Sequence, residues 1–357
     1  MERCYALHML PLRTVHTRIA SFVLSAAIIA SPAVAFAQTA SFKDVPANHP
    51  AFDAVEYLKS KNIIAGYADG TFKPDAKVNR AEAIKIIVAP YVSAEVLATA
   101  TTSVYADVPA GSWFLPYVEA GRQALAIIDG PPAKTSFLPT SNVKKAEFIK
   151  MLLIANKVDP VTTLAEIRGG LATDVSNPDE WFYPHMRFAV ASSMTMVAED
   201  GTLNPGQELT RAQVALLQYR LEMYKQGRRT QALLTEAETE IMNVLALIES
   251  QDIVNAEYAA TRSTVAARGA LISAPDEAIV KGAVKISEGF QFLVQAYKAG
   301  LQGNLDGAIT LSGSAWNSAA KAIEFSPGLT TVSTQMQGIA KSLADEARAL
   351  KAGTPAQ

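Results

Sequence analysis

The sequence is poor in the side chains that most often build metal centres and nucleophilic active sites. It has one cysteine, Cys4, and four histidines, of which only His49 and His185 lie beyond residue 37. A lone cysteine near the start excludes a disulfide framework and a thiolate metal centre from the rest of the chain. Because two isolated histidines do not form a metal site, we predict no metal and no cofactor.

An excess of positive charge is also missing. The 357 residues carry 32 Lys and Arg against 34 Asp and Glu, a formal net charge of -2. Proteins that bind nucleic acid or anionic lipid by electrostatics carry a basic patch or stripe, so neither partner is expected. Hydrophobic residues make up 49%, which is enough to form packed cores.

Long apolar runs are scarce, and the one candidate lies near the start of the chain. Arg13 and Arg18 precede the apolar run Ile19–Ala30, and the small-residue site Ala35–Ala37 follows it. This order is typical of a secretory signal peptide, which we place at residues 1–37. The run is short for a membrane span, so export without a membrane anchor is predicted and an uncleaved anchor is the alternative.

Three segments of the chain begin and end alike. Each opens on an Asp-Val pair, in Phe42–Pro46, Tyr105–Pro109 and Ala172–Ser176. Each closes on a tetrad whose second residue is basic, in Asn79–Glu82, Lys144–Glu147 and Thr210–Gln213. The separation between start and tetrad is nearly constant, which predicts an internal repeat.

Each repeat is predicted to hold two short helices joined by a turn. In the first repeat, apolar residues recur every third position from Phe52 to Leu58, as on one face of a helix. Gly66 is expected to end this segment with a positive φ. Asn79 and Glu82 have the spacing of a capping box at the start of the second helix, and Thr210–Gln213 repeats it.

This pattern resembles the S-layer homology (SLH) domain, whose repeats read roughly FxDVpxxhWaxxaIxxlxxxgiixGyxdGtFxPnxxiTRAEfaxil. The first repeat here reads FKDVPANHPAFDAVEYLKSKNIIAGYADGTFKPDAKVNRAEAIKII. We place the three repeats at residues 42–95, 105–158 and 172–225. The resemblance implies a pseudo-threefold trimer of short helices and loops within one chain.

The resemblance also implies a function at the cell wall or S-layer. SLH repeats hold exported proteins non-covalently on secondary cell-wall polysaccharide, which often ends in a pyruvate ketal, or on a peptidoglycan-linked polymer. The ligand lies in grooves between repeats. The partner expected here is therefore such a polymer.

Five residues are the candidate polysaccharide-binding residues: Arg80, Lys145, Arg211, Trp113 and Trp181. The first three are the basic residues of the tetrads, in the first helical turn, where free N–H groups and the macrodipole favour an anion. A guanidinium can also grip a carboxylate through two hydrogen bonds. Each tryptophan can stack on a sugar ring, although a place in the core is the alternative.

Several residues depart from the SLH pattern. Pro50 replaces the usual tryptophan, Lys144 replaces a capping hydroxyl, and Met194–Met196 replaces a glycine. We therefore expect one or two competent grooves, with Arg80 and Arg211 as the better candidates. The leading aspartates of the repeats are expected to cap the first helix or the loop before it: Asp44, Asp107 and Asp174.

The last part of the chain, residues 230–352, is predicted to be an antiparallel helical bundle. Its apolar residues recur at helical spacing, and the predicted helices span residues 235–271, 276–301, 305–323 and 330–350. The first is long enough to pair with another chain, so an assembly or spacer role and self-association are possible interpretations. The fold class as a whole is mainly α.

No catalytic constellation is apparent, and we predict that the protein is not an enzyme. Carboxylates such as Glu236 and Glu249 are spread as on a solvated face. Two alternatives stay open: an SLH-anchored hydrolase of the envelope with an unrecognised carboxylate site, and a scaffold whose degenerate repeats no longer bind sugar.

Overall fold

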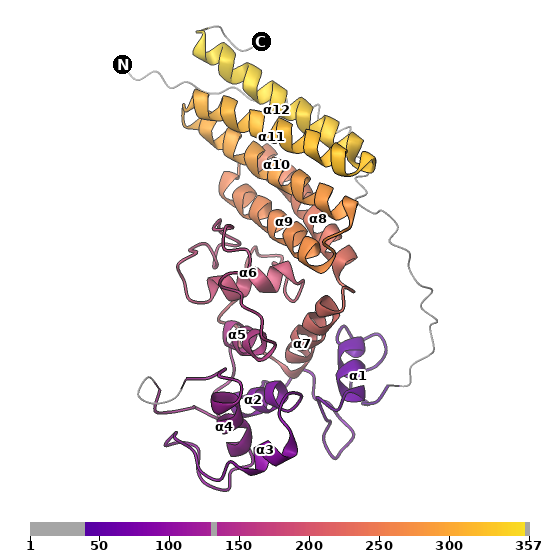
Figure 1. The fold of residues 1–357 in the computed structure, drawn as a ribbon, viewed down its shortest axis with the longest axis vertical. Helices are drawn as coiled ribbons and strands as arrows, with labels where there is room; N and C mark the ends of the chain where they lie inside the picture. The colour runs from indigo at the N-terminus through magenta and orange to yellow at the C-terminus, as the bar shows by residue number, and fades with distance from the viewer. Residues whose placement is uncertain (1–39, 130–133, 354–357) are drawn as a thin grey trace.

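A computed structural model describes residues 40–129 and 134–353 of the chain. The predicted signal peptide lies outside these residues. The described residues form twelve α-helices and no β-strand, as the predicted mainly α fold class requires. The repeats occupy one end of an elongated molecule, and the C-terminal helices are stacked at the other (Figure 1).

Each repeat contributes two helices, as predicted. The pairs are α1 (Phe52–Ser60) and α2 (Arg80–Val88), α4 (Leu115–Gln123) and α5 (Lys145–Ala155), and α6 (Tyr183–Ala191) and α7 (Arg211–Lys225). A short helix, α3 (Ala94–Ala98), lies between the first two repeats. The capping boxes predicted for α2 and α7 are both present, whereas the Lys144 side chain makes no cap hydrogen bond at α5.

A closed ring of backbone hydrogen bonds joins the three repeats. The Val78 amide donates to the Leu209 carbonyl, the Leu209 amide to the Val143 carbonyl, and the Val143 amide to the Val78 carbonyl, over 2.9–3.1 Å. Around this ring α4 packs on α2, α6 on α5 and α1 on α7. The first helix of each repeat therefore lies against the second helix of the repeat before it, which confirms the pseudo-threefold arrangement.

The leading aspartates act in a different place from the one predicted. Both carboxylate oxygens of Asp44 accept hydrogen bonds from the amides of Phe72 and Lys73, over 2.8 Å. Asp107 and Asp174 do the same in their repeats, to residues 137–138 and 203–204. Each aspartate thus ties the start of its repeat to the extended segment before the second helix, and does not cap the first helix.

The prediction for Gly66 was also wrong in its reason. The positive φ after α1 belongs to Asn62, at 56°. At Gly66 an added Cβ would lie 2.2 Å from the ring of Phe42, so the position requires glycine because another part of the repeat packs closely against it. Glycine is required both where φ is positive and where another segment packs closely against the backbone, and the sequence does not distinguish the two cases.

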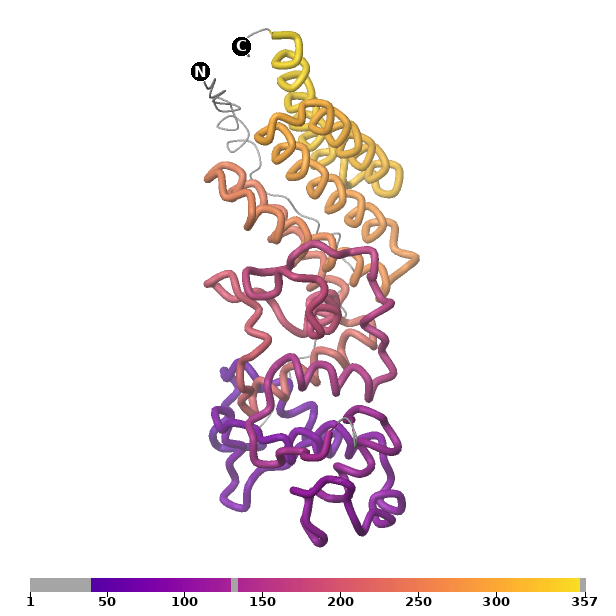
Figure 2. The backbone as a smooth tube through the Cα atoms, turned by 90° about the vertical axis from the view of Figure 1, so that its left-hand side faces the viewer, coloured from indigo at the N-terminus to yellow at the C-terminus, as the bar shows by residue number. Residues whose placement is uncertain are grey.

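The C-terminal region consists of five long helices: α8 (Thr230–Glu249), α9 (Ile253–Ser273), α10 (Ala278–Leu301), α11 (Leu305–Phe325) and α12 (Thr330–Lys351). The single helix predicted from 235 to 271 is therefore two. Gln251 adopts a left-handed φ of 63°, and the Asp252 carboxylate accepts from the Asn255 amide to begin α9. Each helix packs against its neighbours in sequence, so the helices form a stacked row (Figure 2).

The third repeat and the first helices of this row share one apolar core. Helix α9 lies across α6, and an added Cβ at Gly269 would lie only 1.7 Å from the Ala191 carbonyl oxygen. The Tyr224 hydroxyl donates to the Gly269 carbonyl over 3.1 Å. The row of helices is thus packed directly onto the repeats.

Candidate polysaccharide-binding site

The helix N-termini of the repeats are already occupied by backbone partners. At α2 the Arg80 amide donates to the Ser141 carbonyl and the Ala81 amide to the Pro139 carbonyl. The amides of Lys145 and Arg211, with those of the residues after them, donate in the same way to carbonyls of the next repeat around the ring. The N–H groups expected to bind an anion therefore hold the repeats together instead.

The three basic tetrad side chains also bridge the repeats. Arg80 Nε donates to the Phe137 carbonyl over 2.8 Å, and Arg211 Nε donates to the Phe72 carbonyl over 2.7 Å. Lys145 Nζ donates to the Leu203 carbonyl over 2.8 Å. The accepting carbonyls occupy equivalent places, next to the amides that each leading aspartate binds. One role of these side chains is therefore structural.

Lys145 is partly buried. Burial lowers its pKa to about 8, and nearby Asp174 only partly opposes this effect. Its single ammonium group is directed to the Leu203 carbonyl. An ammonium group cannot form the two parallel hydrogen bonds to a carboxylate that a guanidinium forms. Lys145 is therefore a poorer candidate ligand residue than the arginines, as we expected from the sequence.

A pocket of about 570 Å³ lies on the second repeat, between Arg80 and Trp181. We call it the Arg80–Trp181 pocket. Its charged lining residues are four cations and two carboxylates: Arg80, Lys134, Lys144, Lys150, Asp129 and Glu147. Arg80 approaches Glu147 at 3.5 Å, with both side chains partly exposed. The excess of positive charge favours an anionic ligand.

Trp181 forms the aromatic side of this pocket. Its side chain is 52% exposed, with the Lys150 ammonium 5.8 Å from the ring centroid. Trp113 has the equivalent place one repeat earlier, 53% exposed, with the Lys85 ammonium at 5.6 Å. Both tryptophans therefore lie on the surface and not in the core, and each has a lysine beside it.

The third junction between repeats is built differently. Leu216 stands on α7 where the other two repeats have Lys85 and Lys150, and it packs against the apolar cluster of the first repeat. Tyr57 and Tyr219 meet edge to face there, with centroids 5.3 Å apart. Because Pro50 also replaces the tryptophan, this junction lacks both the lysine and the tryptophan of the other two junctions.

The structure thus brings together only some of the predicted site residues. Arg80 and Trp181 line one pocket, and Trp113 lies at another junction. Lys145 and Arg211 do not line that pocket, and like Arg80 they are directed to backbone carbonyls. Sequence reasoning missed the lysines of the pocket: Lys134, Lys144 and Lys150. Lys85 and Lys150 each follow a tetrad basic residue by five positions, and this recurrence was the available signal.

Comparison with known proteins finds the repeated unit three times. The model of the S-layer homology domain matches residues 41–84, 104–149 and 173–215. The chain carries three S-layer homology domains. The five C-terminal helices, α8 to α12, lie outside the residues that match the SLH model.

Several relatives are named as surface-layer or anchoring proteins of bacteria. An S-layer protein of Bacillus licheniformis is 30% identical over 171 residues, which cover 45% of this chain and 19% of that protein. A cellulosome-anchoring protein of Acetivibrio thermocellus is 32% identical over 117 residues, 31% of this chain and 25% of that protein. The chain thus spans about a quarter or less of the length of these relatives. The SLH protein described here is an exported protein of the cell surface.

A third relative comes from a different kind of surface. The outer membrane protein SlpA of Deinococcus radiodurans is 46% identical over 67 residues, 19% of this chain and 6% of that protein. Within residues 40–129 and 134–353, no helix has the length and apolar character needed to cross a membrane. The same residues contain no group of three or more histidine, cysteine or acidic side chains placed to hold a metal ion.

Proposed function

We propose that the SLH repeats anchor this protein to an anionic polysaccharide of the cell wall, chiefly through the Arg80–Trp181 pocket. The observation that carries the proposal is the grouping of four cations beside a half-exposed tryptophan. A guanidinium or ammonium group can bind a carboxylate of the polymer, and an indole face can stack on a sugar ring. The name of the cellulosome-anchoring relative supports an anchoring role.

The junction at Trp113 is proposed as a second, weaker contact for the same polymer. It offers Lys85 and Tyr117 beside the tryptophan, with the Lys85 ammonium 5.6 Å from the Trp113 centroid and 5.8 Å from the Tyr117 centroid. Two weak sites on one long polymer raise the apparent affinity through effective concentration. The junction at Leu216 takes no part in this proposal.

The five C-terminal helices are proposed as a spacer and assembly module, and the protein as a whole as non-catalytic. Because α9 is packed on α6, the row of helices leaves the repeats in a fixed direction. Such a rigid connection suits a module that presents a surface at a set distance from the wall. These relatives are named as surface-layer and anchoring proteins and not as enzymes.

Co-sedimentation with purified sacculi tests the anchoring proposal. The chain without its first 37 residues is mixed with intact sacculi and with sacculi stripped of secondary polymer. We expect pelleting with intact walls, its loss with stripped walls, and weaker pelleting after Lys150→Ala. The matched control is Lys321→Ala, an exposed lysine on α11 outside the repeats, which leaves pelleting unchanged. Equal pelleting with stripped walls contradicts a polymer ligand.

A further inference from the structure

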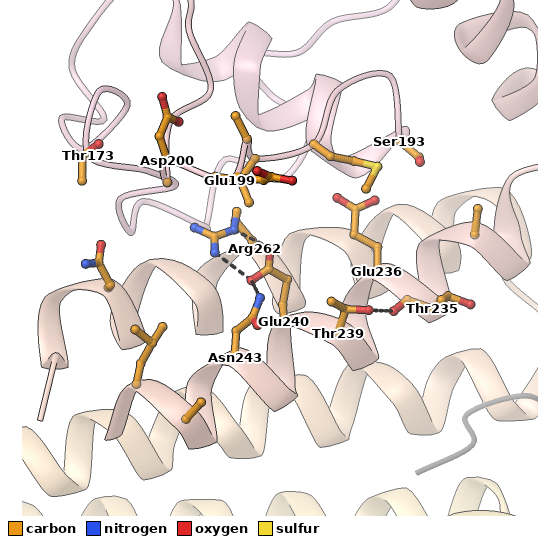
Figure 3. A pocket seen from close by; sticks show the side chains of 18 of the residues that line it. Thr173, Ser193, Glu199, Asp200, Thr235, Glu236, Thr239, Glu240, Asn243 and Arg262 are labelled. Carbon is orange, nitrogen blue, oxygen red and sulfur yellow. Dashed lines mark hydrogen bonds and ion pairs between the residues drawn. The ribbon is translucent and has the colours of Figure 1, made fainter. Parts of the chain in front are cut away.

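A second pocket of about 1050 Å³ lies where the third repeat meets α8 and α9 (Figure 3). We call it the Glu236 pocket. One wall comes from the loop of the third repeat that contains Met196 and Asp200, and the other comes from α8, with Arg262 of α9 at its side. No SLH groove between repeats includes this place, because its second wall lies outside the SLH domains.

The charge of this pocket is opposite to that of the Arg80–Trp181 pocket. Four carboxylates and two guanidinium groups line it: Glu199, Asp200, Glu236, Glu240, Arg229 and Arg262. Arg262 is engaged by Glu240, at 2.6 Å and 2.7 Å, and by the Leu171 carbonyl. Among the remaining lining groups, one guanidinium, that of Arg229, stands beside the carboxyl groups of Glu199, Asp200 and Glu236. Acidic groups therefore outnumber basic ones, and the pocket favours a cation.

One carboxyl oxygen of Glu236 lacks a hydrogen-bond partner. This atom, Oε2, is shielded from solvent. The Arg229 Nη2 atom donates to the Ser193 hydroxyl over 2.5 Å, and Ser193 in turn hydrogen-bonds to Glu236. Desolvation, followed by the charge of Glu240, raises the pKa of Glu236 to about 8. A buried carboxyl oxygen without a partner costs folding free energy that a ligand cation would recover.

We propose that the Glu236 pocket binds a small ligand that joins an ammonium group to an apolar body. The ammonium group pairs with the Glu236 carboxylate. The apolar body lies along the uncharged part of the lining, which includes Met196, Val197 and Ala232. A concave surface that combines apolar side chains with polar groups is typical of small-molecule sites.

Titration calorimetry with hexylamine tests the proposal on the chain without its first 37 residues, and hexanoate and hexanol are the matched probes. We expect binding of hexylamine alone. Glu236→Gln should weaken it by about tenfold or more, the value of one charge-assisted hydrogen bond. The control is Glu249→Gln, an exposed position at the end of α8, which leaves the affinity unchanged.

Proton release gives an independent readout. Glu236 is largely protonated at pH 7, so pairing with an ammonium ion should expel its proton and make the heat of binding depend on the buffer. The other ionisable groups around it are Glu199, Asp200, Glu240, Arg229, Arg262 and the nearby Arg220. No hexylamine binding, equal binding of hexanol, or unchanged affinity in Glu236→Gln would each overturn the proposal.

Discussion

Arg211 Nε donates a hydrogen bond of 2.7 Å to the carbonyl oxygen of Phe72, a residue of the first repeat. Its Nη2 atom donates to the Ala65 carbonyl over 3.0 Å, and the guanidinium lies 4.5 Å from the Phe72 ring centroid. The third repeat is thereby fastened to the first, which closes the ring of repeats. Loss of binding in an Arg211 variant could therefore follow from a loosened fold.

The Arg211→Ala variant should be measurably less stable than the wild type. It removes two hydrogen bonds from a charged donor and leaves two carbonyls without it, so we expect a loss of about 2–3 kcal/mol in the free energy of unfolding. Urea denaturation followed by circular dichroism measures this loss. Arg228→Ala, at an exposed position after α7, serves as the control and should change stability by less than about 0.5 kcal/mol.

The Gly269→Ala substitution should disrupt the packing of α9 on α6. The new methyl group would meet the Ala191 carbonyl oxygen at 1.7 Å, and backbone cannot move aside as a flexible side chain can. Overpacking of this kind costs about 1–3 kcal/mol or more, so thermal unfolding should begin at a clearly lower temperature. The variant that separates packing from helix propensity is Gly300→Ala, in α10, where nothing lies within 4 Å of the added Cβ.

Gly300→Ala should be neutral or stabilising by up to about 1 kcal/mol, because alanine favours the helix. If Gly269→Ala were equally stable, α9 could not pack as closely on α6 as the Gly269–Ala191 contact requires. Hydrogen exchange then locates the effect. The amides of α6 and α9 should lose protection together in Gly269→Ala, since they share one apolar core.

The sequence pattern predicted those features of the fold that are set by short stretches of chain. The capping boxes at Asn79 and Thr210 depend on residues three positions apart, and both are present. The three Asp-Val starts and the basic tetrads predicted three SLH repeats, and three SLH domains are found. The break at Gln251 was missed because its left-handed φ of 63° carries no glycine to mark it.

The roles of individual side chains were harder to predict because their partners lie far away in sequence. Arg80 looked like an anion ligand at a helix start, but its Nε atom is 2.8 Å from the Phe137 carbonyl, 57 positions on. Glu236 looked like one carboxylate of a solvated face, whereas the loop of the third repeat shields its Oε2 atom. Periodicity shows which residues share a helix face and not what covers that face.

Glu236 should make the stability of the protein depend on pH. Its pKa is about 8 in the folded chain, above the value of 4.5 for an unperturbed glutamate. Because the pKa is raised, the folded state binds the Glu236 proton more tightly than the unfolded state does. The stabilisation that results is fully present below pH 4.5 and is lost as pH rises through 8. As pH rises, the unfolding free energy of the wild type should therefore fall relative to that of Glu236→Gln.

The difference between the two proteins should grow by about 2–4 kcal/mol from pH 5 to pH 8. Urea denaturation at several pH values measures it, and comparison with Glu236→Gln cancels the titration of all other groups. Parallel stability curves for the two proteins would show that Glu236 ionises normally. Saturating hexylamine should flatten the wild-type curve, because the ammonium ion stabilises the ionised carboxylate.

The two exposed tryptophans should contribute unequally to wall binding. Trp181→Ala removes the aromatic side of the pocket that holds four cations, whereas Trp113→Ala leaves that pocket intact. We expect Trp181→Ala to weaken co-sedimentation by about 3- to 10-fold and Trp113→Ala to weaken it less. Trp181→Phe should restore part of the affinity, because a smaller ring still stacks on a sugar.

Trp316→Ala is the matched control, because Trp316 is 42% exposed on α11, outside the SLH domains. It should pellet with sacculi as the wild type does, and all variants should unfold at similar urea concentrations. An equal loss for Trp113→Ala and Trp181→Ala would mean that both junctions bind the polymer alike, and the cations around Trp181 would then not set the strength of anchoring. A loss for Trp316→Ala would instead place part of the wall contact on the row of C-terminal helices.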